Sequence, residues 1–350
     1  TLTYQWYVIG ISGSWTAVVN GGIYSGATST TLSISNIAGL DDYQYYCQIR
    51  ESTATCYTAT KATLIRISKK TWNGITWSGD GLPPISTQKA IIDGDLTLPY
   101  AIGPTTYDKL EACECQVNNG KKLIVGNSTG TTPATLMIQG AFVNNGEVTI
   151  HNNSSLVQVN DDAINTGTYT GTKFEVKRNY TAGQYDYVYW GAPTALFPVA
   201  SLPTSHKYQW NTTFDNTNGT QGNWVSPTTE MTPGIGYIAR ASNGSSTPIL
   251  NSFSFTGKPN NGLITVPISR GNYNGDGITT GLDYDAEPLN TNNLDTTRWD
   301  DNWNLLGNPY PSAINVLDFL TANTNIEGFV NIWTHSSPPN SDTDPYYQDF

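Results

Sequence analysis

The feature that most constrains the fold of this chain is the length of its apolar runs, which are short and separated by Gly and Asn. From Lys89 onward, segments such as KAIIDGDL, KKLIVG, EVTIHN and TKFEVKR follow one another in this way. Short runs bounded by turn residues are typical of β-strands. The spacing therefore predicts an all-β protein of many short strands.

The composition favours the same class. The 350 residues include 33 Gly, 10 Trp and 21 Tyr but only 13% charged residues, and Thr, Asn and Ser are abundant. Aromatic and β-branched side chains suit a pleated surface, while Gly and Asn suit turns. The one helix that we expect is short, from Pro311 to about Ala322, with Ser312 as its N-cap.

The charge of the chain argues against two classes of partner. Its formal net charge is −11, with 17 Lys and Arg against 28 Asp and Glu. This field repels phosphate backbones and anionic lipids, so we expect no nucleic-acid partner. The sequence contains no run of 18 apolar residues, so we also expect no membrane insertion.

The four cysteines do not have the spacing of a zinc site. Cys47 and Cys56 are candidates for a disulfide across a hairpin in an oxidising compartment, provided that the cross-strand distance suits the bond. Cys113 and Cys115 form a CxC pair that we do not expect to bridge.

The first segment, residues 1–68, has the pattern of an immunoglobulin-like sandwich. That fold places a buried Trp on its third strand, and near the sixth strand an acidic residue, then Tyr, then Cys two residues later. Four residues fit this pattern: Trp6, Asp41, Tyr45 and Cys47. The first two strands of such a sandwich would precede Thr1, so we expect a domain that is truncated at its N-terminus.

The second segment, residues 71–184, contains an internal repeat. The pattern V-N-N-G-x-x-x-I occurs at Val117–Ile124 and again at Val143–Ile150, 26 residues later. Repeats of this length with Asn-Gly corners suit a parallel β-solenoid, in which each coil buries its apolar face on the next. An antiparallel meander is the alternative, because Asn-Asn-Gly is equally a hairpin turn.

The third segment, residues 185–350, predicts a β-sandwich or jelly-roll that is unfinished at its C-terminus. Its clearest local signal is SFSFTGKPNNGLITVPIS, residues 252–269, where two alternating runs flank a Gly/Pro/Asn turn. This pattern predicts a β-hairpin.

Four motifs, TWNGITWSGDGLPP, AFVNNGEVTIHNNSSLVQVND, DYVYWGAP and DNWNLLGNPYPSAI, resemble the large cell-surface proteins of Bacteroidota that are exported by the type IX secretion system, including gliding-motility adhesins. The resemblance covers roughly residues 71–335. It implies a secreted or cell-surface location, adhesion or surface movement, and surface glycans or other surface proteins as partners. It also implies export through a C-terminal sorting domain that these residues do not include.

The segment NYNGDGITTGLD, residues 272–283, resembles a dockerin-type calcium loop. Such loops need oxygen ligands at positions 1, 3 and 5, Gly at 6, a backbone carbonyl at 7 and an acidic residue at 12. The candidate ligands are Asn272, Asn274, Asp276, Ile278, Thr280 and Asp283. The segment departs from the pattern in three ways: position 1 is Asn, position 12 is Asp, and the flanks lack helical character. A Gly-rich turn is therefore the alternative. Four nearby carboxylates are further candidate ligands: Asp285, Asp295, Asp300 and Asp301.

No motif predicts catalysis. Gly126–Gly130 spells the GxSxG of a nucleophile elbow, but a turn and a strand follow it where the elbow needs a helix. His151, His206 and His335 lack paired ligand spacing. Asp186 and Asp318 would be an arbitrary choice of carboxylate pair for glycoside hydrolysis.

Aromatic residues offer a second kind of site. Exposed Trp side chains could stack on sugars, although most Trp in sandwiches lie in cores. The candidates are Trp72, Trp77, Trp190, Trp210, Trp224, Trp299, Trp303 and Trp333.

We therefore expect a non-enzymatic adhesin or stalk segment of a larger extracellular protein, in which rigid β modules present a binding face. Three alternatives stay open. The first is the carbohydrate-binding module of a secreted enzyme, and the second is a filament or sheath subunit that associates through its sheet edges. The third is an enzyme, which would require a cleft with two or more convergent acids of shifted pKa.

Overall fold

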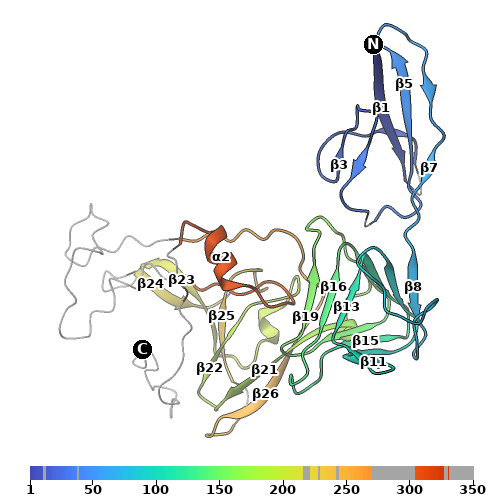
Figure 1. Ribbon diagram of the computed structural model, residues 1–350. Coiled ribbons are helices and arrows are strands. Elements are labelled where there is room, and N and C mark those ends of the chain that lie inside the picture. Colours follow the sequence, from blue (N-terminus) through green and yellow to red (C-terminus); the bar gives the residue numbers. More distant parts are fainter. Residues whose placement is uncertain are drawn as a thin grey trace. The chain divides into compact units, whose positions relative to one another are not determined.

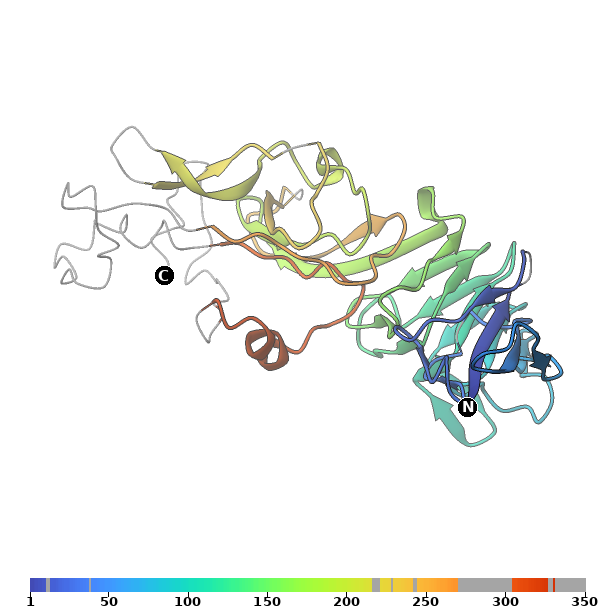
Figure 2. The ribbon, with the colours of Figure 1, turned by 90° about the horizontal axis from the view of Figure 1, so that it is seen from above.

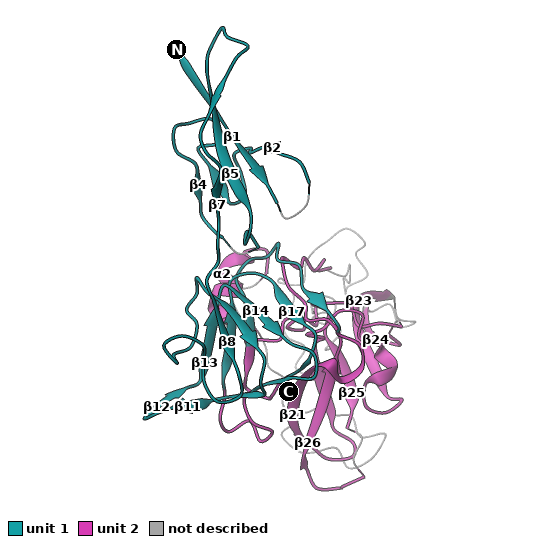
Figure 3. Ribbon diagram, turned by 90° about the vertical axis from the view of Figure 1, so that its right-hand side faces the viewer, with its two compact units in different colours: residues 1–125, 134–148, 156–168 teal, residues 126–133, 149–155, 169–350 magenta. Residues whose placement is uncertain are grey.

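The computed structural model describes residues 1–10, 13–37, 39–215, 221–227, 229–241, 244–269, 304–326 and 330. The protein is all-β, as the sequence predicted. It divides into two compact units (Figure 3): unit 1 comprises residues 1–125, 134–148 and 156–168, and unit 2 comprises residues 126–133, 149–155 and 169–350. The division into domains at 1–68, 71–184 and 185–350 stays a prediction, because these units follow different boundaries.

The N-terminal part of unit 1 is an incomplete immunoglobulin-like sandwich (Figure 1). Its main sheet has the order β2-β1-β5-β6, with β7 also paired to β5, and a separate β3-β4 pair lies apart from it. The strands are β1 (Leu2–Ile9), β2 (Thr16–Ala17), β3 (Tyr24–Ser25), β4 (Ser33–Ile34), β5 (Gln44–Glu51), β6 (Thr58–Ala59) and β7 (Thr63–Leu64).

The core of this sandwich contains the residues that the sequence pattern singled out. Tyr45 is buried, with Trp6 packed against its cluster, and its hydroxyl lies 2.9 Å from that of Tyr24. Burial and this contact raise the pKa of Tyr45. Asp41 accepts a hydrogen bond of 2.8 Å from the backbone N–H of Ile67.

The candidate disulfide between Cys47 and Cys56 is not formed, and both thiols are free. The register of β5 and β6 explains this, because it pairs Gln48 with Ala59. Thr60 is therefore the neighbour of Cys47, and its Oγ1 accepts a hydrogen bond from the Cys47 N–H. Cys47 is buried and Cys56 is exposed, so the two sulfurs occupy different environments.

The following segment is a parallel β-solenoid of about four turns. Three rows of strands form its sides: β8-β9-β14-β17-β20, β13-β16-β19, and β10-β15-β18. The first row comprises β8 (Lys69–Trp72), β9 (Lys89–Ile92), β14 (Glu114–Val117), β17 (Phe142–Asn144) and β20 (Thr166–Gly167). The second comprises β13 (Lys109–Ala112), β16 (Thr135–Ile138) and β19 (Ser155–Gln158), and the third β10 (Leu96–Leu98), β15 (Lys122–Val125) and β18 (Glu147–Ile150). A β11 (Tyr100–Ile102) and β12 (Thr105–Tyr107) hairpin projects from one coil.

Apolar side chains fill the interior of the coils. Alternate residues of the solenoid strands point inward, and the innermost have almost no exposed surface: Ile92, Leu98, Leu110, Val117, Leu123, Leu136, Ile138 and Phe142. Burial of these rows is the main stabilising contribution, at roughly 1.5–3 kcal/mol for each large side chain. The meander alternative is wrong, because neighbouring coils pair in parallel.

Between β14 and β17, the structural repeat is offset by one residue from the repeat that the sequence predicted. Parallel pairing places Val117 beside Asn144, and Val143 beside Gln116. Asn144 is thus fully buried in the interior row. Its Nδ2 donates to the Thr168 carbonyl at 3.0 Å, and its Oδ1 accepts from the Gly146 N–H at 3.2 Å. These two bonds satisfy a polar group in an otherwise apolar row.

Two tryptophans close the first coil. Trp77 is 1% exposed and its Nε1 donates to the Tyr100 hydroxyl at 2.8 Å. The rings of Trp72 and Trp77 lie 5.6 Å apart, and Trp72 donates to the Asp95 carbonyl. The segment that begins at Thr71 therefore covers the apolar end that an open coil would expose.

Unit 2 is a strand-rich sandwich with an aromatic core. Its strands are β21 (Phe174–Ala182), β22 (Tyr187–Trp190), β23 (Lys207–Asp215), β24 (Gln221–Val225), β25 (Tyr237–Arg240) and β26 (Ile249–Thr256), with 3-10 turns η1 (Gly171–Lys173) and η2 (Val199–Ser201). One sheet has the order β22-β25-β23-β24, and β21 pairs antiparallel with β26. The core includes the rings of Trp190, Phe197, Phe253 and Phe255, which contact one another in tilted and edge-on arrangements.

Two local predictions for this region were wrong. Within the predicted hairpin only the first run forms a strand, β26, and its partner is β21, whereas residues 263–269 are not in a strand. The helix α2 (Val316–Ala322) is present but begins later than predicted: Asn315, not Ser312, is its N-cap, and its side chain accepts from the Leu317 and Asp318 N–H groups. No residue of α2, red in Figure 2, is buried.

Candidate functional site

The best candidate site is the outward face of the two central strands of the immunoglobulin-like sheet. β1 and β5 lie side by side and antiparallel (Figure 1). Side chains alternate between the two faces of a strand, so residues paired in this register share a face. Trp6 and Tyr45 point into the core. The opposite face, here called the β1–β5 face, has three cross-strand pairs: Thr3 with Arg50, Gln5 with Gln48, and Tyr7 with Tyr46.

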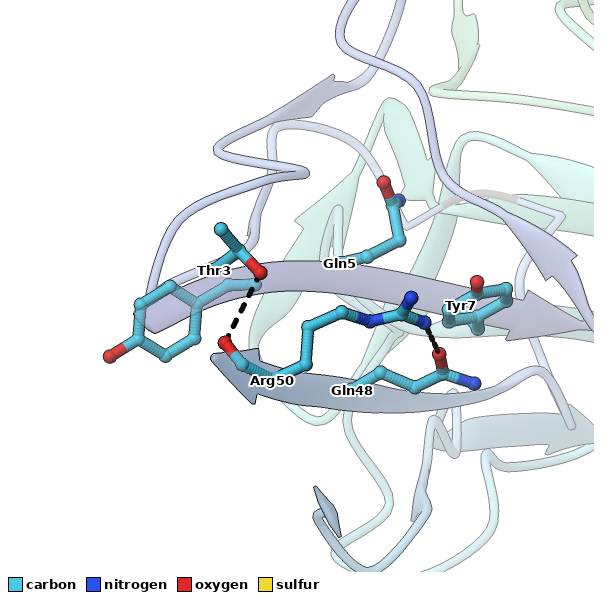
Figure 4. Close-up of a pocket in the computed structure, with 6 residues that line it drawn as sticks. Thr3, Gln5, Tyr7, Gln48 and Arg50 are labelled. Carbon is cyan, nitrogen blue, oxygen red and sulfur yellow. Dashed lines mark hydrogen bonds between the residues drawn. The ribbon is translucent and has the colours of Figure 1, made fainter. Parts of the chain in front are cut away.

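A shallow hollow of about 250 Å³ lies on this face. Figure 4 shows the Arg50 side chain extended along the sheet toward Tyr7, with Gln48 beside it. The residues that line the hollow are Thr3, Tyr4, Gln5, Tyr7, Gln48 and Arg50. This volume lies just below the range of typical ligand pockets, and it suits one ring-sized group.

Aromatic rings form one end of the face. The rings of Tyr7 and Tyr46 are stacked, with centroids 5.2 Å apart and planes at 10°. Trp15 meets Tyr46 edge-on at 4.6 Å, and it is 37% exposed. Tyr46 contacts both other rings and limits their movement, so the accessible surfaces of the three rings are presented without a large cost in side-chain entropy.

Polar side chains are fixed between the rings and the strand ends. Gln48 is buried. Its Nε2 donates to the Tyr46 hydroxyl at 3.0 Å, and its Oε1 accepts from Arg50 at 3.2 Å. The guanidinium also lies over the Tyr57 ring at 5.8 Å. Gln5 donates its Nε2 to the Trp6 and Val18 carbonyls. The network positions one cation and several amide and hydroxyl groups.

This arrangement is suited to binding. Tyr rings offer apolar surface with a polar end, and the amides and the guanidinium offer donors and acceptors at fixed positions. Ligands that combine apolar faces with hydroxyl groups, such as sugars, match this combination.

Sequence reasoning missed this face. The immunoglobulin-like pattern singled out the inward Trp6, but the alternate residues of the same strand, Thr3, Gln5 and Tyr7, form the site. The signal was the period-two alternation itself, seen again in Tyr46, Gln48 and Arg50. The contribution of Trp15 had no such signal, because it lies just before β2 and joins the face through tertiary packing.

The tryptophans proposed for sugar stacking do not form an exposed platform in the described residues. Trp72, Trp77 and Trp190 are buried. Trp210 and Trp224 are partly buried and pack against each other across β23 and β24 at 5.3 Å. Three others lie outside the described residues: Trp299, Trp303 and Trp333.

The candidate calcium loop also lies outside the described residues. This applies to all six ligands, Asn272, Asn274, Asp276, Ile278, Thr280 and Asp283, and to the nearby Asp285, Asp295, Asp300 and Asp301. The calcium site stays a prediction. Within the ranges that the structure describes, no group of three or more His, Cys, Asp or Glu side chains is arranged to hold a metal ion.

The GxSxG segment forms a turn between β15 and β16. Gly126 has φ +83°, and a Cβ there would lie 2.0 Å from the Ser154 Oγ, so close packing explains this glycine. The Asn127 side chain closes the turn through Thr131 and Thr132. The turn leads into a strand, as the sequence predicted.

The remaining candidates lie in separate environments. His151 is partly buried, which lowers its pKa, and His206 is exposed. Asp186 is buried and accepts from the Gly183 N–H at 2.7 Å, whereas Asp318 is exposed in the first turn of α2. His335 lies outside the described residues.

None of the helices in the described part of the chain has the length and apolar character needed to cross a membrane. Residues 66–350 match the family described as a domain of unknown function, DUF8693. The β1–β5 face lies before this matched region. No curated protein and no solved structure is significantly similar to the chain.

Proposed function

Because the chain belongs to the DUF8693 family, whose description names no activity, we propose its function from its structure. We propose that the chain is a non-enzymatic extracellular segment of a larger bacterial surface protein. It binds through the β1–β5 face, and the solenoid is the spacer for this face. It agrees with the role implied by the resemblance to surface adhesins exported by the type IX system. The observation that supports it most is the preorganised set of rings and polar side chains around the hollow.

The solenoid supports the spacer part of this proposal. Its interior is filled by apolar side chains, and parallel backbone pairing continues from coil to coil. Each coil in such a stack contacts its neighbours over a whole face. The stack is therefore stiff, and it fixes the distance between its two ends. In an adhesin, such a spacer increases the reach of a weak binding face, and several copies on one surface add avidity.

An adhesion assay tests the proposal. Beads coated with the full chain are passed over films of galacturonate, alginate, xylan and dextran. The fraction of beads retained under flow is measured as a function of the density of protein on the bead surface. We expect retention that rises steeply with density and falls when Tyr46 is replaced by Ala. Retention that is unchanged in Tyr46→Ala would contradict the proposed face. New reducing ends in the films would contradict the non-enzymatic role.

The second candidate function is a carbohydrate-binding module of a secreted enzyme. The same ring stack and hollow favour it, because they suit soluble sugar chains as well as surfaces. Such a module binds its ligand stably as a single copy. The retention of coated beads would therefore already be near maximal at a low density of protein on the bead surface. This density dependence separates the two functions.

A further inference from the structure

We infer that the hollow on the β1–β5 face takes a carboxylated sugar of a glycan chain, with Arg50 as the partner of the carboxylate. This inference rests on the proposed binding function and narrows its ligand class. It follows from the charge of the hollow, the way in which Arg50 is held, and the neighbouring ring and amide groups.

The charge of the hollow is opposite to that of the chain. Arg50 is the one charged side chain among the six that line it, and no carboxylate lines it. The full sequence has a net charge of −11. Several other cations of unit 1 lie in ion pairs: Arg66 pairs with Asp42, Lys70 with Asp80 and Lys89 with Glu114. Arg50 forms no ion pair with any residue in the described ranges, so its charge is available to an anion.

Arg50 is also held in place for such a ligand. The bond to the Gln48 Oε1 is the one hydrogen bond that its guanidinium donates within the described part of the chain. Gln48 is itself anchored on Tyr46, and the Tyr57 ring lies at 5.8 Å from the guanidinium carbon. A guanidinium has five N–H donors in a planar fork that matches a carboxylate. Those not used by Gln48 can bind both carboxylate oxygens.

The neighbouring groups favour a sugar as the carrier of that carboxylate. Tyr7 lines the hollow and is stacked on Tyr46, which gives a fixed aromatic edge beside the cation. Gln5 uses its Nε2 on two backbone carbonyls, and its Oε1 has no partner among the described residues. This oxygen can accept from a sugar hydroxyl. An acidic peptide would supply the carboxylate without these hydroxyls.

Calorimetric titration of the full chain tests the inference with four probes. These are oligogalacturonate, its fully methyl-esterified form, dextran sulfate and polyglutamate, each at pH 6 and two salt concentrations. We expect oligogalacturonate to bind, and the methyl ester to bind roughly tenfold more weakly because its charge-assisted hydrogen bonds are lost. Binding of oligogalacturonate should weaken as salt rises.

Variants locate the effect. Arg50→Gln should weaken oligogalacturonate binding roughly tenfold, and Arg50→Lys should restore part of it, since the charge returns without the fork. Arg66→Gln is the matched control, because Arg66 lies on the same sandwich but pairs with Asp42. It should bind as the unaltered chain does. The thermal midpoint of each variant shows that it is folded.

Three results would overturn the inference: equal affinity for the acid and its methyl ester, unchanged affinity in Arg50→Gln, or tighter binding of polyglutamate or dextran sulfate. Equal binding of acidic and neutral sugars that is lost in Tyr46→Ala would reject the acidic ligand but leave the proposed function intact. Absence of binding to all four probes would overturn the inference, and retention in the adhesion assay would then decide the proposed function separately.

Discussion

The rings of Tyr7 and Tyr46 lie face to face across β1 and β5, with centroids 5.2 Å apart and planes only 10° from parallel. This pair links the sheet register to the proposed function, because the same register that directs Trp6 and Tyr45 into the core directs these rings outward. The first prediction concerns this pair.

Replacing Tyr46 by Ala should weaken glycan binding by roughly tenfold, since one stacked ring and the hydrogen-bond partner of Gln48 are lost. Tyr46→Phe keeps the ring and removes only the hydroxyl, so its loss should be smaller. Tyr189→Ala, which removes an exposed Tyr from β22, is the control. Affinities from titration calorimetry measure the series. An equal loss in the control would show a general effect of aromatic truncation.

The second prediction concerns the end of the solenoid, where the Trp77 Nε1 donates to the Tyr100 hydroxyl at 2.8 Å. Trp77→Phe and Tyr100→Phe each remove one partner of this bond. In a double-mutant cycle, the coupling free energy from urea unfolding should be about 1 kcal/mol in favour of the intact pair. Additive effects would mean that the bond does not stabilise the folded state.

The third prediction concerns the buried amide of Asn144. Asn144→Val introduces the residue type that the neighbouring coil has at Val117, but it leaves the Gly146 N–H and the Thr168 carbonyl without their partner. We expect a loss of about 1–3 kcal/mol in the free energy of unfolding. Asn145→Val, which replaces the exposed neighbouring residue, is the control. It should change the free energy of unfolding by about 0.5 kcal/mol or less. A more stable Asn144→Val protein would show that the hydrogen bonds of the buried amide do not stabilise the fold.

The fourth prediction concerns the thiols. Burial raises the pKa of Cys113 to about 11 and of Cys115 to about 12, and it also raises that of Cys47. Thiols held neutral do not act as nucleophiles. At pH 8, Ellman's reagent should therefore modify one thiol per chain rapidly, the exposed Cys56. Cys56→Ser should abolish the rapid phase. No rapid phase in the unaltered chain would indicate that Cys56 is already bonded.

The same shifts give a pH dependence with a defined sign. A thiol whose pKa is raised by folding stays protonated in the folded state while the unfolded chain ionises near its ordinary value. The contribution to stability is therefore complete below about pH 9, and it is lost as the pH rises toward 11 to 12. Urea unfolding above pH 9 should show this decline.

The sequence allowed the fold class to be predicted because strand length and turn composition act locally. Short runs between Asn and Gly predicted the strands, and the 26-residue repeat predicted the solenoid. The exact register could not be predicted in this way. It depends on how many residues each corner contains, and the pairing of Val117 with Asn144 reflects the packing of whole coils.

The errors have the same origin in tertiary structure. β26 had the alternation of a hairpin arm, yet it pairs with β21, from which it is separated by four other strands of the chain. Cys47 and Cys56 had a hairpin-like spacing, but the β5–β6 register places Thr60 beside Cys47. At the candidate site, alternation alone would have revealed Thr3, Gln5 and Tyr7, whereas Trp15 reaches the face only in the folded chain.

The most direct test of the binding face is oxidative footprinting of Tyr and Trp side chains by mass spectrometry, with and without saturating oligogalacturonate. The account predicts that Tyr7, Trp15 and Tyr46 become protected together, while the exposed Tyr189 is oxidised equally in both samples. Protection of aromatic side chains elsewhere, with these three unchanged, would contradict it.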